Sequence, residues 1–348
     1  MIPHSKPTIG KDDEEAILRV LHSGQIAQGR ITREFEKKFA SFIDLKDGVA
    51  LNCGTSALHL SLLALEVKED DEVIIPSYTC TALLNAVNYV RAKPRIVDID
   101  RDDYNISFSE IEKNLTKKTK AVIVPHMFGA PVKEILKILK FGLPVIEDCA
   151  QAIGATSNGK MIGTFGILSI FSFYATKVMT TGEGGMVLSN SKRLLEKIRD
   201  LRDYDEKKDY KIRYNYKMTD IQAALGLSQL RKLPDFIKKR KETASTYSRH
   251  FSSLGLRIPE FREGHIYFRY IIEQELSSVE KFLRKLRRAG INCKKPVFRP
   301  LHHYLGLKGF LNSEDAWQCS VSIPIYPSLT ENEIKKIIES VRYLFVEK

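Results

Sequence analysis

The chain has 348 residues, of which 43% are hydrophobic, and it carries a formal net charge of +12. That length suffices for one large α/β core with a smaller appended domain. No apolar run approaches the roughly 20 residues that span a bilayer, and the N-terminal segment lacks the apolar core of a signal peptide, so we expect no membrane contact and a cytoplasmic location.

The first part of the chain has the pattern of an α/β fold. Helices are predicted over 12–21 and 32–43, and Phe35, Phe39 and Phe42 fall on one face of the second. Short β-rich runs then alternate with helical stretches, which is typical of a layered, mostly parallel sheet. These runs cover 73–78, 95–100, 121–126, 144–149 and 167–173.

The pattern changes near residue 219. Thr219 and Gln222 have the spacing of a capping box, which opens a long helical stretch with Pro234 as its expected break or kink. A strand over 267–275, a helix over 278–289 and a last helix from Glu331 follow. We therefore predict a large domain over residues 1–234 and a smaller α+β domain over residues 235–348.

One lysine stands out because of the strand that precedes it. Lys177 follows the apolar run that contains Ile170, Phe171 and Phe173, and it enters a glycine-rich turn. Desolvation at such a place disfavours the ammonium ion and favours the neutral amine, which can form a Schiff base. Taken alone, a lysine in a basic chain is more often a surface charge.

A carboxylate and an anion-binding turn accompany this lysine. Asp148 ends an apolar strand, where ligands of an open parallel sheet gather, and a Schiff-base lysine with an acid is what pyridoxal phosphate (PLP) requires. Gly54, Thr55 and Ser56 form a short polar turn before an apolar helix, whose free amides favour an anion such as phosphate. The three features together predict PLP as the cofactor.

The order of the motifs resembles one enzyme family. The chain contains GTSALHLSLLAL, DEVIIPSYT, AKPRIVDID, VIEDCAQAIGA, FSFYATK, GEGGMV and YNYKMTDIQAALGLSQL, in that order. This order is similar to that of the DegT/DnrJ/EryC1/StrS aminotransferases, the sugar-aminotransferase branch of the fold-type I PLP enzymes. The match covers nearly the whole chain and implies a mostly parallel, seven-stranded type of sheet between helices.

The resemblance also implies roles for single residues. Lys177 matches the Schiff-base lysine, Asp148 the partner of the pyridine nitrogen, and Gln151 a glutamine near the ring hydroxyl. Asn215 matches an asparagine that reaches the phosphate in the neighbouring subunit, which implies a homodimer with shared active sites. The residues that match the family's phosphate contacts are Thr55, Ser56 and Ser172, and Gly54 lets the backbone of this turn come close to the cofactor.

Two positions bear on the cofactor ring and the substrate. Cys80 stands where the family usually has an aromatic residue that stacks on the ring, and Tyr78 or His126 is expected to cover that face instead. His302 resembles a family histidine close to the substrate, and Tyr78 is a second substrate candidate. The pair His302 and His303 also raises the possibility of a metal, but adjacent histidines point in divergent directions and no third ligand is evident. No metal site is predicted.

The predicted activity is transamination. An amino acid, with glutamate as the expected donor, would supply an amino group to a ketone on a nucleotide-linked sugar, in amino-sugar, surface-polysaccharide or natural-product biosynthesis. Two alternatives stay open. The first is an aminotransferase on a cyclitol or amino-benzoate precursor, and the second is a PLP-binding regulatory protein without turnover.

Charge and cysteines exclude other classes. The basic residues are typical of solvated helix faces, and no RNA- or DNA-binding motif accompanies them, so no nucleic-acid partner is expected. The excess positive charge favours an anionic, diphosphate-bearing substrate, with a plain solubility role as an equal alternative. The five cysteines show no C-x-x-C spacing, and we expect all of them to be reduced.

Overall fold

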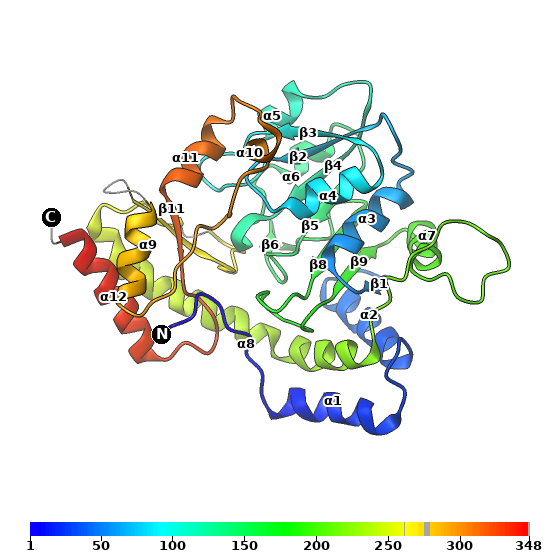
Figure 1. The fold of residues 1–348 in the computed structure, drawn as a ribbon, viewed down its shortest axis with the longest axis horizontal. Helices are drawn as coiled ribbons and strands as arrows, with labels where there is room; N and C mark the ends of the chain where they lie inside the picture. Colours follow the sequence, from blue (N-terminus) through cyan, green and yellow to red (C-terminus); the bar gives the residue numbers. More distant parts are fainter. Residues whose placement is uncertain (261, 275–278, 347–348) are drawn as a thin grey trace.

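The computed structural model describes residues 1–260, 262–274 and 279–346 (Figure 1). A seven-stranded sheet with the order β1-β9-β8-β5-β4-β2-β3 forms its centre. Strands β3, β2, β4, β5 and β8 run parallel, and β9 runs opposite to its neighbours β8 and β1. The predicted mostly parallel sheet is therefore confirmed.

The strands of this sheet follow the predicted runs closely, with two additions. Their bounds are β1 Asp47–Leu51, β2 Glu72–Pro76, β3 Lys93–Val97, β4 Thr119–Pro125, β5 Val145–Asp148, β8 Leu168–Ser172 and β9 Gly185–Ser189. The sequence analysis did not identify β1 and β9 as strands. Both are five residues long and contain a glycine, so their alternation is weak.

Helices cover both faces of the sheet because its strands are apolar on both sides. Val73 and Ile75 pack into a core under α3 (Gly54–Ala64) and α4 (Thr81–Tyr89), whereas Ile74 between them packs into a core on the opposite face. That opposite layer includes α2 (Arg30–Phe42), whose Phe35 and Phe39 contact Phe173.

The remaining elements of this part of the chain are short or peripheral. Two hydrogen-bonded two-residue strands, β6 and β7, form a separate hairpin. Their bounds, and those of the other elements, are α1 Lys11–Ser23, α5 Phe108–Lys113, η1 Met127–Gly129, α6 Ile135–Leu139, β6 Thr156–Ser157, β7 Lys160–Met161 and α7 Lys192–Arg202.

The long helix α8 (Asp220–Phe251) joins the two parts of the molecule. Its capping box of Thr219 and Gln222 is present, as predicted, but the helix does not break at Pro234 and continues for a total of 32 residues. Leu233 lies in the core beside the large sheet, and Tyr247 lies in the core of the C-terminal part. The division at residue 234 stays a prediction.

The C-terminal part is an α+β unit. Strands β10 (Tyr270–Glu273) and β11 (Ser320–Ile323) pair antiparallel, and the N-terminus lies near its helices in Figure 1. Its other elements are η2 Ser252–Leu254, α9 Val279–Arg288, α10 Leu301–Leu305, α11 Leu311–Cys319 and α12 Glu331–Val346. None of the helices among the described residues is long and apolar enough to cross a membrane.

Candidate active site

Lys177 lies in the turn between β8 and β9, where its amide N–H donates to the carbonyl of Tyr174 at 2.8 Å. Its side chain is half-buried, and desolvation lowers the pKa of its ammonium group. Interactions with Cys80 and with the carboxylate of Asp148 raise this pKa, and Arg269 adds to the lowering. Lys177 thus interacts with groups from three other segments of the chain.

Asp148 is the last residue of β5, and its side chain is 7% exposed. Burial raises the pKa of the carboxyl group, while a 3.0 Å hydrogen bond from the amide of Ala150 and the charge of Lys177 favour the carboxylate. The structure therefore brings Lys177, Asp148 and Cys80 into one site at the carboxyl edge of the sheet.

The side-chain amide of Gln151 is fixed through its oxygen. Its Oε1 accepts a 3.1 Å hydrogen bond from the amide of Phe128, and its Nε2 lies 3.9 Å from the Sδ of Met127. A thioether sulfur is a weak acceptor. The anchored oxygen orients the amide, so Nε2 can donate to a ligand oxygen.

The polar turn before α3 meets the end of β8. A Cβ at Gly54 would lie 2.9 Å from the Cβ of Ser172, and a Cβ at Gly185 would lie 2.3 Å from the carbonyl oxygen of Cys53. Glycine at both positions lets the first turn of α3 lie against the two strand ends. Gly54, Thr55, Ser56 and Ser172 are thereby gathered at the N-terminus of an 11-residue helix, a favourable place for an anion.

Two residues of this turn escaped the sequence analysis. Cys53 is the N-cap of α3, and its Sγ accepts from the amide of Ser56 at 3.4 Å. The Oδ1 of Asn52 accepts from the hydroxyl of Ser56 at 2.7 Å. A polar residue directly before G-T-S is the sequence signal that could have identified them.

Asn215 is exposed in the segment between α7 and α8, which extends away from the body of the molecule in Figure 1. The next residue is anchored near α3, because the carbonyl of Tyr216 accepts from the amide of Asn52 at 2.9 Å. The contact of Asn215 with a neighbouring subunit stays a prediction.

Tyr78 and His126 both have side chains with 0% exposure. The hydroxyl of Tyr78 donates to the carbonyl of Ala316 at 3.4 Å. A contact of either residue with a cofactor or a substrate stays a prediction.

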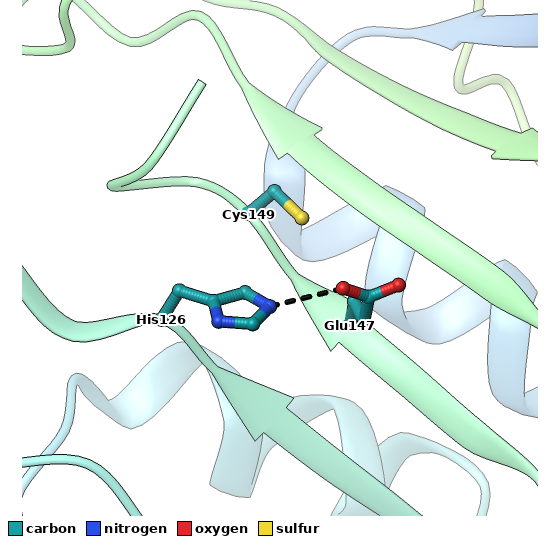
Figure 2. A group of neighbouring side chains, drawn as sticks. All are labelled: His126, Glu147 and Cys149. Atoms are coloured by element: carbon teal, nitrogen blue, oxygen red, sulfur yellow. Dashed lines mark hydrogen bonds and ion pairs between the residues drawn. The ribbon is translucent and has the colours of Figure 1, made fainter. Parts of the chain in front are cut away.

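His126 belongs to a closed cluster with Glu147 and Cys149 behind the site (Figure 2). Nδ1 of His126 accepts from the amide of Val132 at 3.0 Å, so the proton is on Nε2, which donates to Glu147 at 3.1 Å. The carboxylate of Glu147 also accepts three amide hydrogen bonds, from Gly163, Phe165 and Gly166. These hydrogen bonds occupy the atoms of Glu147 and His126 that could otherwise bind a metal ion.

His302 lies at the same edge of the sheet but makes other contacts than expected. Its Nδ1 is 2.6 Å from the hydroxyl of Ser77, and its Nε2 is 3.3 Å from Glu314. His303 Nε2 lies 2.6 Å from the same carboxylate, so the two imidazoles converge on Glu314 and do not diverge. The absence of a metal there stays a prediction, as does a substrate contact of His302.

The sequence analysis also missed Phe268 and Arg269. The Nζ of Lys177 lies 5.4 Å from the centroid of the Phe268 ring, and the Cζ of Arg269 lies 4.9 Å from the same centroid. Both residues precede β10, which the sequence places far from the lysine. The aromatic and basic residues over 267–270 are the sequence feature from which Phe268 and Arg269 could have been identified.

Comparison with known proteins identifies the family. A model of the DegT/DnrJ/EryC1/StrS aminotransferase family matches residues 7–342. The chain belongs to this family. It is 38% identical to an uncharacterized protein of Methanocaldococcus jannaschii, with 99% of this chain and 98% of that protein covered. It is 35% identical to the GDP-perosamine synthase of Escherichia coli O157:H7, with 100% and 99% covered.

A solved structure extends the likeness to three dimensions. The Spr1654 protein of Streptococcus pneumoniae, in its PLP form, superposes with a TM-score of 0.93 at 26% identity, and 99% of each chain is covered. As a DegT/DnrJ/EryC1/StrS family member, the chain is an aminotransferase with an α/β fold of the fold-type I class. The predictions of family, fold class and enzyme class are thus confirmed.

We predict that Gly185→Ala weakens the binding of PLP by roughly tenfold or more. The new Cβ would displace the backbone of Cys53 and Gly54, and losing even one amide hydrogen bond to a phosphate costs about 1.5 kcal/mol or more. Titration of each protein with PLP, followed by fluorescence, measures this. Gly10→Ala is the control, because a Cβ there meets nothing within 4 Å. Equal affinity in both variants would contradict the role of this turn.

Glu147→Gln should lower the free energy of unfolding by about 3 kcal/mol, because the amide cannot accept all four hydrogen bonds and its NH₂ faces other donors. Urea unfolding followed by circular dichroism tests this. Glu134→Gln, which disrupts an exposed pair with Lys137, should change the free energy by less than about 1 kcal/mol. A Glu147→Gln variant as stable as this control would refute the structural role of the carboxylate.

Lys177 in the PLP-free protein should be methylated by formaldehyde and cyanoborohydride with a pH midpoint below the ~10.4 of a free lysine. Because Asp148 raises the pKa of this lysine, Asp148→Asn should lower the midpoint further. Mass spectrometry of the peptide that contains Lys177, relative to the other lysine peptides, gives the profile. A midpoint at the ordinary value, or an upward shift in the variant, would contradict this electrostatic arrangement.

Proposed function

We propose that this aminotransferase uses PLP to move an amino group from an amino acid, with glutamate as the expected donor, to a ketone of a nucleotide-linked sugar. The observation that carries the proposal is the half-buried amine of Lys177 beside the buried carboxylate of Asp148 and near the helix α3 cradle. Relatives named as GDP-perosamine synthases of three bacteria support a sugar substrate.

The residues at the site fit PLP in three respects. The first turn of α3, with Ser172 beside it, offers amides and hydroxyls to a phosphate. The Nε2 of Gln151 can donate to the ring hydroxyl oxygen. Asp148 can keep a pyridine nitrogen protonated, because its carboxylate is shielded from water and would pair with the positive charge. PLP, when bound, supplies an electron sink for the negative charge that develops at the carbon of the amino donor.

The protein would position the reactants and move the proton. Lys177, when its side-chain amine is not covalently bound, would take a proton from the donor carbon as general base and return it as general acid. A lowered pKa suits both roles near neutral pH. Asp148 would keep its charge opposite the pyridine nitrogen. The partial burial of these groups strengthens each electrostatic interaction relative to water.

A homodimer with shared sites and a cytoplasmic location belong to this proposal. The exposed position of Asn215, between Tyr214 and Tyr216, whose backbones bond to α7 and to the turn before α3, is consistent with a contribution to a second subunit. A spore coat polysaccharide biosynthesis protein of Bacillus subtilis, 34% identical to this chain, supports a place in surface-polysaccharide synthesis.

The test is amino transfer to a panel of nucleotide-linked ketosugars, with L-glutamate as donor and product detection by mass spectrometry. We expect an amino sugar from at least one member of the panel, and Lys177→Ala should lower the turnover at least about a thousandfold. Lys160→Ala, at an exposed position, should leave it unchanged. Amination only of a cyclitol or an amino-benzoate precursor would move the substrate to that class. No turnover with PLP bound would favour a regulatory protein.

A further inference from the structure

Arg269 brings a second cation to the side of Lys177. Its guanidinium lies over the ring of Phe268, the same ring that the Nζ of Lys177 approaches. Its amide donates to the carbonyl of Phe128 at 3.2 Å, and the amide of Phe128 donates to Gln151. The backbone around Arg269 is thus fixed to the loop that orients Gln151.

The guanidinium of Arg269 has no acidic partner among the described residues. The shielded Arg202 and Arg262 pair with carboxylates, Glu36 at 2.7 Å and Asp103 at 2.9 Å, whereas the buried Arg240 donates to backbone carbonyls. Arg269 instead donates through one guanidinium nitrogen to Nδ1 of His4, at 2.8 Å. Burial alone lowers its pKa to about 10, and no acid offsets this effect.

His4 orients this guanidinium without neutralising it. Burial, with the charges of Arg269 and Lys294, lowers the pKa of His4 to about 2, so the imidazole is neutral. Its Nε2 also lies 2.9 Å from the hydroxyl of Ser322, which fixes the ring. Among residues 1–260, 262–274 and 279–346 no carboxylate pairs with this half-buried cation, and an anionic ligand would supply a counter-ion.

We propose that Arg269 binds a carboxylate of the amino-acid donor and orients the donor toward Lys177. The inference rests on the proposed function. An amino donor must bring its carboxylate next to the lysine that moves its proton, and a guanidinium offers a planar pair of N–H groups that matches a carboxylate. The phosphate cradle at α3 is a separate place, built from other segments.

The experiment compares the PLP-loaded wild type with Arg269→Gln, Arg269→Lys and Lys294→Gln. Lys294→Gln is the matched control, because it removes one positive charge that also acts on His4 but lies on an exposed side chain. Two quantities report on donor binding in each protein. These are the dissociation constant of glutarate, a dicarboxylate that cannot react, by calorimetry, and kcat/KM for L-glutamate.

In Arg269→Gln we expect glutarate to bind at least thirtyfold more weakly and kcat/KM for L-glutamate to fall at least a hundredfold. The KM for the ketosugar and the affinity for PLP should stay within threefold of the wild type. Arg269→Lys should restore part of the loss, and Lys294→Gln should match the wild type. The PLP affinity and a thermal unfolding curve show whether each variant is folded.

Three results would overturn the proposal. The first is that the wild type does not bind glutarate. The second is that the Arg269→Gln variant binds glutarate as tightly as the wild type. The third is that Arg269→Gln changes only the KM for the ketosugar, which would place a diphosphate at Arg269. Failure of the proposed function is a different result. In that case the wild type binds glutarate through Arg269 but transfers no amino group.

Discussion

The site depends on the hydrogen bonds that the carboxylate of Glu147 accepts, and this side chain has no exposure to solvent. It accepts amide hydrogen bonds from the turn at 163–166 and one from His126 at the end of β4. The ends of β4 and β5 and the entry to β8 are thereby held together. Successive residues of a strand point to opposite faces, so fixing Glu147 on one face directs Asp148 to the face of α3 and α4.

The same alternation places the other groups of the site. On β8, Ile170 packs toward α3 and Phe171 packs toward α2, and Ser172 therefore faces the turn before α3. Lys177 follows five residues later, within electrostatic reach of Asp148. The ammonium of Lys177 favours the ionised form of Asp148, and Asp148 favours the ammonium. The strand geometry thus determines both the position and the charge of the reactive groups.

The sequence alone could locate the site residues whose position depends on one strand and on the few residues that follow it. Asp148 at a strand end, Lys177 after an apolar strand and the turn at Gly54 could each be located from local pattern, and parallel strands bring their ends together. Arg269 and His4 could not be linked to Lys177 in this way, since they depend on how residues before β10 fold back onto the large domain. The complete burial of Tyr78 and His126 could not be predicted either, because sequence proximity to the site does not reveal the direction of a side chain. Pro234 did not end α8, since packing against two cores outweighs the local cost of proline.

The central proposal is that the amine of Lys177 joins the protein to PLP, opposite Asp148. Reduction of the PLP-loaded protein with sodium borohydride, followed by peptide mass spectrometry, tests this most directly. We predict one modified peptide, with the pyridoxyl group on Lys177. A pyridoxyl group on another lysine, or no modification of the folded, PLP-loaded protein, would contradict the account.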